Sequence, residues 1–255
     1  MKQPLLIDFD GVLQIDNKII EDTKILFDYL KESGRKACIL SNSSLYGEEE
    51  LKEMFNKAKI KIEIPILTTV DTSVNYLQNN YKNAAVYVSE NILKYFNDFL
   101  EYQNPEAVLI GDIGEKWNYT LMQTIFEFIN NGAKLIAMHK NNFWQKPGRG
   151  IVLDSGTFVH ALEFATNKKA KLIGKPSRIY FESALKKIGC SANEKFIMLG
   201  DDLISDMEGA KNLNAETILI YTGKTKPPLS SSEKKDIDYE VKKIKEVVEI
   251  LKNKG

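Results

Sequence analysis

The sequence has only two cysteines and no long apolar run, and each scarcity excludes a class of protein. Cys38 and Cys190 lack the spacing of a metal site, so we expect two reduced thiols in an intracellular protein. No run approaches the roughly 20 apolar residues that a membrane span needs. The first residues pass directly into strand-like sequence and leave no room for a signal peptide, so we expect a cytoplasmic protein.

An excess of charge of one sign is also missing. Lys+Arg and Asp+Glu number 35 each, so the formal net charge is zero. This balance gives no electrostatic reason to expect a nucleic acid or an acidic membrane as a partner. The apolar content of 43% and charged content of 27% are ordinary for a soluble globular protein. A chain of 255 residues is long enough for one large α/β domain or two modest ones.

What the chain does contain is a repeated alternation of strand-like and helix-like segments. The pattern starts afresh near residue 84, and a polar, irregular stretch at 139–150 interrupts it. We expect strands at 5–7, 36–40, 84–88, 107–110, 134–138, 170–173, 195–199 and 216–221. We expect helices at 22–33, 47–57, 68–80, 90–102, 116–130, 155–165 and 177–188, near 204, and at the C-terminus. Such alternation predicts an α/β fold with a largely parallel, doubly wound sheet.

The stretch at 5–13 carries the first chemical signal. An apolar run ends abruptly in Asp8, and Asp10 and Gly11 follow. Carboxylates that interrupt a buried strand are costly unless a cation or hydrogen-bond donors receive them. Ligands bind at the carboxyl ends of strands in open α/β sheets, and Mg²⁺ prefers carboxylate and phosphate oxygens. The stretch therefore indicates a Mg²⁺ and phosphate site, although an ordinary turn of the Asx type would use the same residues.

Two further strand-like runs end in polar residues. One is followed by Ser41 and Asn42, and the other by Gly200, Asp201 and Asp202. In a parallel sheet these ends share one edge, so groups that lie far apart in the sequence can converge. Lys175 stands at the head of a predicted helix and can balance the carboxylates. The set supplies the positioning and the charge compensation that phosphoryl transfer requires.

Four motifs in order give the chain a family resemblance. They are Asp8-x-Asp10-Gly-Val, Ser41-Asn42, Gly174-Lys175-Pro176 and Gly200-Asp201-Asp202-x-x-x-Asp206, and the runs at 135–140, 161–166 and 206–210 add to them. The chain resembles the haloacid dehalogenase (HAD) superfamily of phosphatases, in its NagD-like branch with a C2-type cap. The resemblance covers nearly the whole chain. With the restarted strand–helix pattern, it implies a Rossmann-like core (1–80 and 174–255) and an inserted α/β cap (81–173).

The resemblance implies roles for the residues of the first and last motifs. Asp8 would be the nucleophile that forms an aspartyl-phosphate. Asp10 would protonate the leaving oxygen and then deprotonate water, with a pKa raised by neighbouring carboxylates. Asp201 would bind Mg²⁺ together with Asp8 and the backbone carbonyl of Asp10. Asp206, and also Asp202, would act behind the direct metal ligands.

The remaining motifs would bind the phosphoryl group. The Ser41 hydroxyl and backbone N–H groups around Gly11 and Asn42 would donate hydrogen bonds to it. Lys175 would pair with phosphate and with the nucleophile as a point charge. Ser replaces the Thr that many relatives carry at position 41, and this change keeps the hydroxyl.

The cap is expected to choose the leaving group. His139 and Lys140 enter the irregular stretch, so they would contact substrate, although they could equally belong to a solvated loop. A capped cleft implies small phosphorylated metabolites as substrates, and which metabolite stays open. Relatives commonly dimerise through the cap, which makes a homodimer an expectation.

Other functions are compatible with parts of this pattern. The dehalogenases of the superfamily lack the acid at the second Asp, so Asp10 favours a phosphatase. A receiver-type signalling module also uses an acidic pocket, a hydroxyl and a lysine, but it takes phosphate on a separate, later strand. A catalytically silent binding protein of the same fold is the third alternative, and the presence of all the expected catalytic groups argues against it.

Overall fold

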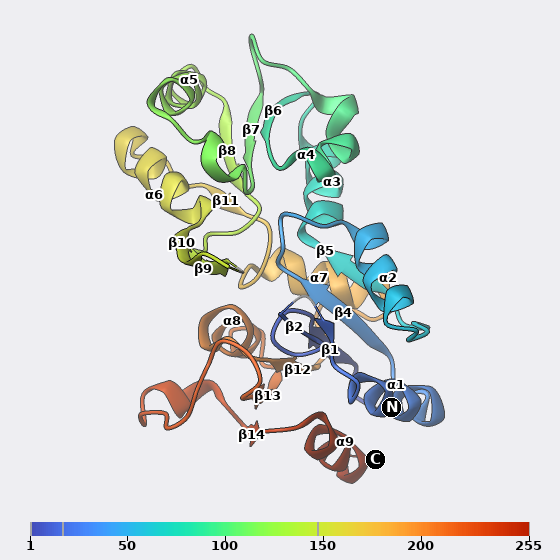
Figure 1. Ribbon diagram of the computed structural model, residues 1–255. Helices are drawn as coiled ribbons and strands as arrows, with labels where there is room; N and C mark the ends of the chain where they lie inside the picture. The colour runs from blue at the N-terminus through green and yellow to red at the C-terminus, as the bar shows by residue number, and fades with distance from the viewer. Residues whose placement is uncertain (1, 17, 147, 255) are drawn as a thin grey trace. The chain divides into compact units, whose positions relative to one another are not determined.

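The computed structural model describes residues 2–16, 18–146 and 148–254, which divide into two compact units (Figure 1). The first unit contains the described residues up to Ser41, Glu48–Leu67, and those from Lys175 onward. The second contains Asn42–Gly47 and Thr68–Gly174. The range expected for the cap, 81–173, is narrower than this second unit. As limits of a functional core and cap, the ranges derived from the sequence stay a prediction.

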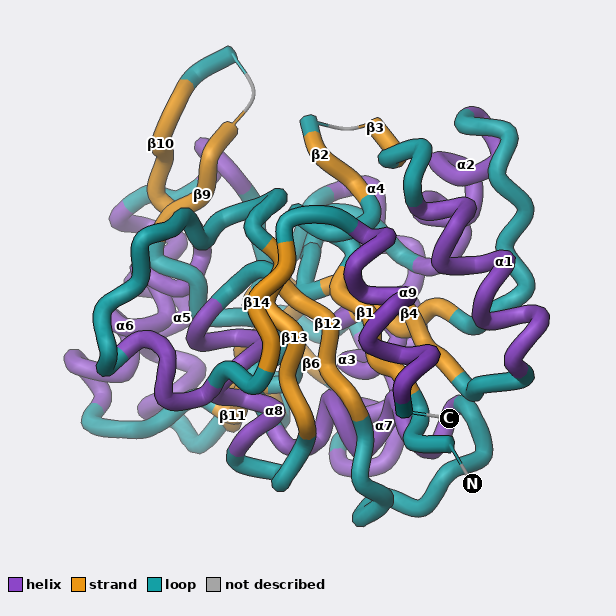
Figure 2. Tube along the Cα trace, turned by 90° about the horizontal axis from the view of Figure 1, so that it is seen from below, coloured by secondary structure: helices purple, strands orange, loops and turns teal. Residues whose placement is uncertain are grey.

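The first unit is built on a six-stranded sheet in the order β14-β13-β12-β1-β4-β5. Figure 2 shows β1 between β12 and β4, and both of these pairs are parallel. The pairs β12–β13 and β13–β14 are parallel as well. The predicted α/β class with a parallel sheet is therefore confirmed. The strands are β1 (Leu5–Asp8), β4 (Ala37–Ser41), β5 (Ile66–Thr68), β12 (Ile197–Gly200), β13 (Glu216–Ile220) and β14 (Tyr239–Val241).

Helices and short elements complete this unit. One face of the sheet packs Leu6, Leu40 and Met198 against Tyr180 and Phe181, because alternate side chains of a strand point to the same face. The elements are β2 (Gln14–Ile15), β3 (Lys18–Ile19), α1 (Thr23–Ser33), α2 (Glu48–Lys57), α7 (Arg178–Lys187), the π-helix η3 (Leu203–Glu208), α8 (Gly209–Lys211), η4 (Glu233–Asp236) and α9 (Ile244–Asn253).

A buried arginine joins the two ends of the first unit. The Arg35 side chain donates from Nη1 to the carbonyl oxygen of Gln3 at 2.7 Å and from Nη2 to that of Leu251 at 3.1 Å. The Tyr29 hydroxyl donates to the same Leu251 carbonyl at 3.0 Å. The last carbonyls of a helix have no partner within it, so Arg35 and Tyr29 satisfy the end of α9 from the other end of the chain.

The second unit has its own four-stranded parallel sheet, in the order β11-β8-β7-β6. Ala84 and Val86 face the apolar cluster formed with α3, whereas Ala85 faces the cluster formed with α5 and α6. Each face of the sheet is therefore covered. The elements are α3 (Thr69–Asn80), β6 (Ala84–Tyr87), α4 (Glu90–Leu93), η1 (Lys94–Phe99), β7 (Ala107–Ile110), η2 (Gly114–Lys116), α5 (Tyr119–Asn130), β8 (Lys134–Ala137), α6 (Ser155–Thr166) and β11 (Lys171–Leu172).

The stretch expected to be irregular, 139–150, supplies the first strand of a β-hairpin whose second strand follows it. Strands β9 (Phe143–Lys146) and β10 (Gly150–Leu153) pair antiparallel, with Leu153 opposite Phe143. Both of these side chains are exposed. No helix in the described part of the chain is long and apolar enough to cross a membrane.

Candidate active site

The first unit carries its polar cluster at the carboxyl edge of the six-stranded sheet. Strand β1 is fully buried from Leu5 to Ile7 and delivers Asp8, whose side chain is also buried. The chain then turns sharply, with Gly11 at a φ of +81°, which suits glycine because it has no Cβ. A Cβ at Gly11 would also overlap the carboxylate of Asp201. The turn after β1 therefore lies directly against the turn after β12.

Lys175 is the cation at the centre of this cluster. Its Nζ lies 2.5 Å from Asp8 Oδ1 and 2.6 Å from Asp206 Oδ1, and all three side chains are buried. Burial alone would lower the pKa of Lys175, but the charges of Asp206 and Asp8 raise it above its ordinary value. The ammonium is therefore charged at any physiological pH, and it holds the expected nucleophile in place.

Asp206 organises the turn at the end of β12. Its Oδ2 accepts the backbone N–H groups of Asp201 at 3.2 Å and Asp202 at 3.1 Å, while Oδ1 contacts Lys175. A Cβ at Gly200 would lie 2.5 Å from the Asp206 Cβ, so only glycine fits at that position. With these contacts at both oxygens, Asp206 supports its neighbours, and its place behind the direct metal ligands stays a prediction.

Asp202 has a different environment. Its Oδ1 caps η3 by accepting the N–H groups of Ile204 at 2.8 Å and Ser205 at 3.1 Å, and its Oδ2 pairs with the Lys224 ammonium. Burial would raise the pKa of Asp202, but Lys224 and these N–H donors hold it below the ordinary value. The carboxylate therefore serves as a helix cap, a role that the sequence pattern did not indicate.

Asp8, Asp201 and Asp206 form an unbalanced group of negative charges. One carboxylate oxygen of each lies within 4.8 Å of the others. Burial, and then the neighbouring carboxylates, raise the pKa of Asp201 and Asp206, and burial raises that of Asp8 to about 8 despite the opposing effect of Lys175. A divalent cation would remove this penalty, and oxygen donors in this arrangement suit Mg²⁺. The residues present therefore fit the expected metal.

Asp10 and Ser41 lie beside this group. As a whole residue Asp10 is exposed, although its carboxylate contacts Gln14 in a partly buried position, and Ser41, the last residue of β4, is fully buried. The protein around Asp10 desolvates its carboxylate and raises its pKa, whereas Lys175 and a hydrogen bond with Ser41 lower it. Desolvation is thus the main cause of the raised pKa, and not the crowding by carboxylates that we expected.

One backbone N–H group that we expected to bind the phosphoryl group already has a hydrogen-bond partner within the fold. The Gly11 N–H donates to the Gln14 carbonyl at 2.8 Å. The Ser41 carbonyl accepts the Tyr180 hydroxyl at 2.6 Å, which fixes the end of β4. Binding of a phosphoryl group by the Ser41 hydroxyl and by the N–H groups near Gly11 stays a prediction.

A loop that sequence reasoning missed also belongs to this site. After β13 the chain continues through Thr222, Gly223 and Lys224, and the Lys224 N–H donates to Asp201 Oδ2. The signal was present in the sequence, because this is another parallel strand whose carboxyl end runs into polar residues and a glycine.

Three residues expected at the site belong to the second unit: Asn42, His139 and Lys140. His139 is buried, with Nε2 3.0 Å from the Ser44 Oγ, and Lys140 Nζ lies 2.6 Å from Glu163 Oε1. These are structural contacts within that unit. Contact of Asn42, His139 or Lys140 with substrate stays a prediction.

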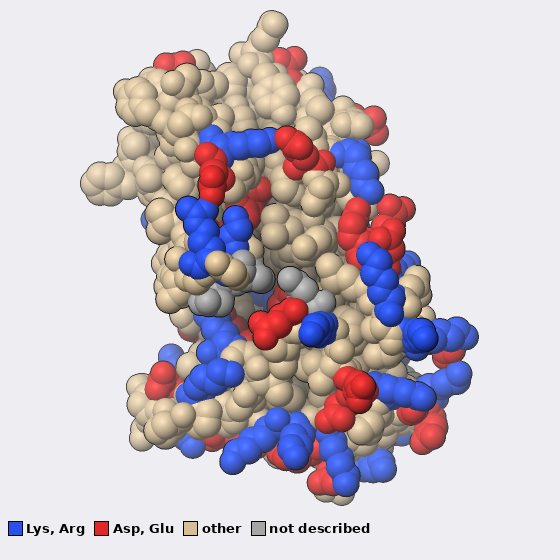
Figure 3. All heavy atoms as spheres, viewed as in Figure 1, with Lys and Arg blue, Asp and Glu red and all other residues tan. Residues whose placement is uncertain are grey.

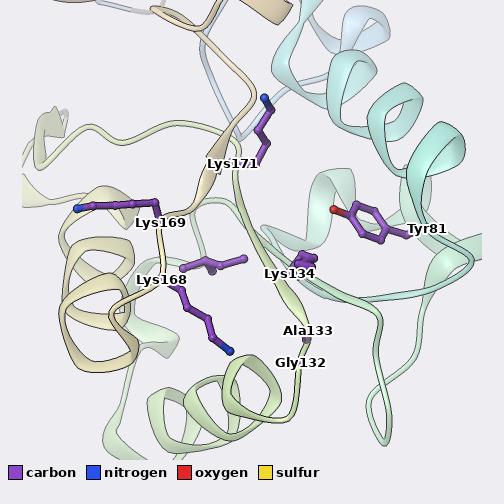
Figure 4. Close-up of a pocket in the computed structure, with 8 residues that line it drawn as sticks. Tyr81, Gly132, Ala133, Lys134, Lys168, Lys169 and Lys171 are labelled. Carbon is purple, nitrogen blue, oxygen red and sulfur yellow. The ribbon is translucent and has the colours of Figure 1, made fainter.

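The second unit also has a pocket of about 300 Å³ at the opposite, amino-terminal end of its sheet. Its lining includes Tyr81, Lys134, Lys168, Lys169 and Lys171. Figure 4 shows the side chains of Lys168, Lys169 and Lys171 pointing in different directions. Lys168 donates to the Ile129 carbonyl, so its ammonium is used in the fold. The lysines do not converge on one point as ligands of a single anion would.

Comparison with known proteins agrees with this geometry. Residues 5–99 match the family model of haloacid dehalogenase-like hydrolases, and residues 172–247 match a HAD-hydrolase-like model. The chain is 31% identical over 223 residues to mouse haloacid dehalogenase-like hydrolase domain-containing protein 2, covering 87% of this chain and 85% of that protein. It is 29% identical to mouse phospholysine phosphohistidine inorganic pyrophosphate phosphatase, covering 97% and 93%.

Solved structures show the same fold. The p-nitrophenyl phosphatase from Archaeoglobus fulgidus superposes with a TM-score of 0.86 at 23% identity, covering 98% of this chain and 99% of that one. NagD from E. coli K-12 gives a TM-score of 0.80 at 21% identity, covering 95% and 96%. The resemblance inferred from the motifs is confirmed, and so is the prediction of an enzyme. The chain belongs to the haloacid dehalogenase-like hydrolase family.

Proposed function

We propose that this hydrolase is a Mg²⁺-dependent phosphatase that cleaves small phosphorylated metabolites through an aspartyl-phosphate on Asp8. The observation that supports this most directly is the buried contact of Asp8 with Lys175, beside Asp201 and Asp206. Two of the relatives named above are themselves called phosphatases.

In the first half of the reaction, a carboxylate oxygen of Asp8 attacks phosphorus and the bond from phosphorus to the leaving oxygen breaks. Asp10, two residues further along the turn, donates its proton to that oxygen. Its raised pKa suits this role, because part of the carboxyl group stays protonated at a higher pH than usual. Lys175 holds Asp8 and offsets the negative charge of the incoming phosphate.

In the second half, Asp10 accepts a proton from water, and the water oxygen attacks the phosphorus of the aspartyl-phosphate. The bond from phosphorus to Asp8 then breaks, which releases phosphate and restores the Asp8 carboxylate. The same residue thus acts first as acid and then as base, and the protons balance over one turnover.

Asp8 and Asp201 would hold the metal through their carboxylates, and Asp10 through its backbone carbonyl. When bound, Mg²⁺ supplies positive charge that neutralises the phosphoryl oxygens and favours ionised Asp8. Asp206 would keep Lys175 and the Asp201 backbone in place through the contacts described above.

The second unit would serve as the cap that excludes bulk water and selects the leaving group, with His139 and Lys140 as substrate contacts. On the face shown in Figure 3, basic and acidic side chains are interspersed, which supports a small-molecule substrate over a nucleic acid. A homodimer through the cap and a cytoplasmic location complete the proposal.

The test is phosphate release from p-nitrophenyl phosphate and a panel of metabolites, with Mg²⁺ or with EDTA. Wild type should turn over only with Mg²⁺, and Asp8→Asn should lose the activity while keeping its circular dichroism spectrum. Asp28→Asn changes an exposed carboxylate of α1 and should behave as wild type.

Other outcomes would favour the alternatives. Stable phosphorylation of Asp8 without turnover would point to a signalling module of the receiver type. No release from any compound by folded protein would point to a silent binding protein. Equal activity of Asp8→Asn and wild type would refute the proposed mechanism.

A further inference from the structure

The loop from Thr222 to Thr225 holds Asp201 at two points. The Lys224 N–H donates to Asp201 Oδ2, and the Thr225 N–H donates to the Asp201 carbonyl at 3.1 Å. Both the side chain and the backbone of Asp201 are therefore fixed by N–H groups of one short segment. An acceptor held by backbone donors has little freedom to rotate, so this loop sets how the Asp201 carboxylate is oriented relative to Asp8 and Asp206.

The same loop is joined to the turn that follows β1. The Thr222 hydroxyl donates to the Gly11 carbonyl at 2.5 Å. A Cβ at Gly223 would lie 2.7 Å from the Gly11 Cα and 2.6 Å from the Asp201 Cγ, closer than real Cβ contacts permit. The absence of a side chain at position 223 thus allows the loop to lie directly on Gly11 and Asp201.

The Lys224 side chain gives Asp202 a partner of its own. Its ammonium pairs with Asp202 Oδ2, while Asp202 Oδ1 caps η3. Two adjacent aspartates are thereby given different partners. Asp201 remains with Asp8 and Asp206, and Asp202 is held by the loop and by the helix.

We propose that the segment Thr222–Thr225 is a positioning clamp for the metal site. It ties the turn of the nucleophile to the turn of Asp201 and orients the Asp201 carboxylate for the cation. Thr222 and Gly223 act through Gly11 and Asp201, as positioning residues. The inference rests on the proposed Mg²⁺-dependent function and adds to it a structural cause of Mg²⁺ affinity.

The first test removes only the hydroxyl anchor. Thr222→Val is nearly isosteric and loses the hydrogen bond to the Gly11 carbonyl, whereas Thr222→Ser keeps a hydroxyl. The matched control is Thr120→Val, at an exposed threonine of α5. The apparent Mg²⁺ Kd is measured by titrating MgCl₂ into EDTA-stripped full-length protein and following its melting temperature.

Thr222→Val should raise the apparent Kd about five- to tenfold, which corresponds to the loss of one hydrogen bond. Thr222→Ser should return the Kd to within about twofold of wild type, and Thr120→Val should not change it. A residue with a merely structural role would lower the melting temperature in EDTA and leave the Mg²⁺ Kd unaltered. A wild-type Kd in Thr222→Val would therefore overturn the clamp.

Gly223→Ala tests the close approach itself and should weaken Mg²⁺ binding more than Thr222→Val does. If this variant does not fold, the Thr222 pair still decides the question. Wild type that neither binds Mg²⁺ nor requires it for turnover would overturn the proposed function and the clamp together. Wild type that binds Mg²⁺, with Thr222→Val equal to it, would overturn the clamp alone.

Discussion

The two units carry polar groups at the carboxyl edges of their parallel sheets, yet the groups differ in charge balance. In the first unit Asp8, Asp201 and Asp206 crowd together, and the Lys175 ammonium contacts Asp8 and Asp206. In the second unit the Glu163 carboxylate lies instead among basic side chains, with Lys140 Nζ at 2.6 Å, His160 Nδ1 at 3.3 Å and Lys169 Nζ at 3.9 Å.

A buried network surrounds His139 in the second unit, and it includes the Asp154 carboxylate, whose Oδ1 lies 3.7 Å from His139 Nε2. His139 Nε2 lies 3.0 Å from the Ser44 Oγ and 3.4 Å from the Ser155 Oγ, and Ser44 also accepts the Asp112 N–H at 3.0 Å. Such a closed network stabilises a loop and leaves little for a ligand to satisfy. The comparison teaches that a parallel sheet alone does not create a functional site. The crowded carboxylates at the strand ends of the first unit are what makes its edge a candidate site.

The largest difference between the two edges is expected from removal of a buried carboxylate. Asp8→Asn should lower kcat on the order of 10⁴-fold, because it removes the nucleophile. Asp154→Asn, at the edge of the second sheet, keeps the cap of α6 and should leave kcat within about fivefold. Steady-state kinetics on one substrate checks both, and similar losses in the two variants would erase the distinction.

The next comparison is between the buried Lys175 of the first unit and the half-buried Lys140 of the second. Lys175→Met leaves Asp8 and Asp206 without their cation and should lower kcat about 10²- to 10³-fold, the loss typical of one electrostatic contact in a reaction site. Lys140→Met should act mainly on KM if Lys140 contacts substrate. A kcat for Lys175→Met near that of wild type would show that its charge is not needed for the reaction.

The unbalanced charge should also appear in the pH dependence of stability. Burial raises the pKa of Asp8 from 3.8 to about 8, so between these values the folded state binds more protons than the unfolded state. The stability of the metal-free protein should therefore fall as pH rises through this range. Mg²⁺ displaces these protons, so it should raise the melting temperature more at pH 8 than at pH 6.

Melting curves in EDTA and in MgCl₂ at several pH values measure this effect. Asp8→Asn, which lacks the titrating group, should give a flatter profile in EDTA. A gain from Mg²⁺ that is the same at every pH would contradict the assignment of these carboxylates as the metal site.

The smallest effect is expected at Glu163 in the second unit. Glu163→Gln keeps an acceptor for the Ala170 N–H but loses the charge opposite Lys140 and Lys169, which should cost about 1 kcal/mol in the free energy of unfolding. Urea denaturation with an unchanged m-value checks this. A loss above about 4 kcal/mol would place Glu163 among the few exceptional sites and would show that the pair does more than balance charge.

The sequence was most informative where a long apolar run ended in polar residues. β1, β4 and β12 were predicted in this way, and their ends meet in the cluster of Asp8, Ser41 and Asp201. The pattern works because a buried strand must be apolar on both faces, so a polar residue marks its end.

Short elements could not be found in the same way. Strands β5 and β14 have three residues each, too few for a periodic pattern, and β9 lies in the polar stretch 139–150 that was interpreted as irregular. The different duties of Asp201 and Asp202 depend on Lys224, which lies more than twenty residues away and is brought close only by the fold. Long-range partners of this kind leave no mark in local sequence.

The position of β1 between β4 and β12 has a consequence for the order in which the protein forms on the ribosome. Thr68–Gly174, most of the second unit, is synthesised before Lys175 and β12 exist. Domains tend to fold as units while the chain is being made, so the second unit can acquire its structure while the first still lacks half of its sheet. An unfinished chain therefore contains Asp8 before it contains Lys175, Asp201 or Asp206, and the acidic cluster is assembled only after β12 and η3 have been synthesised.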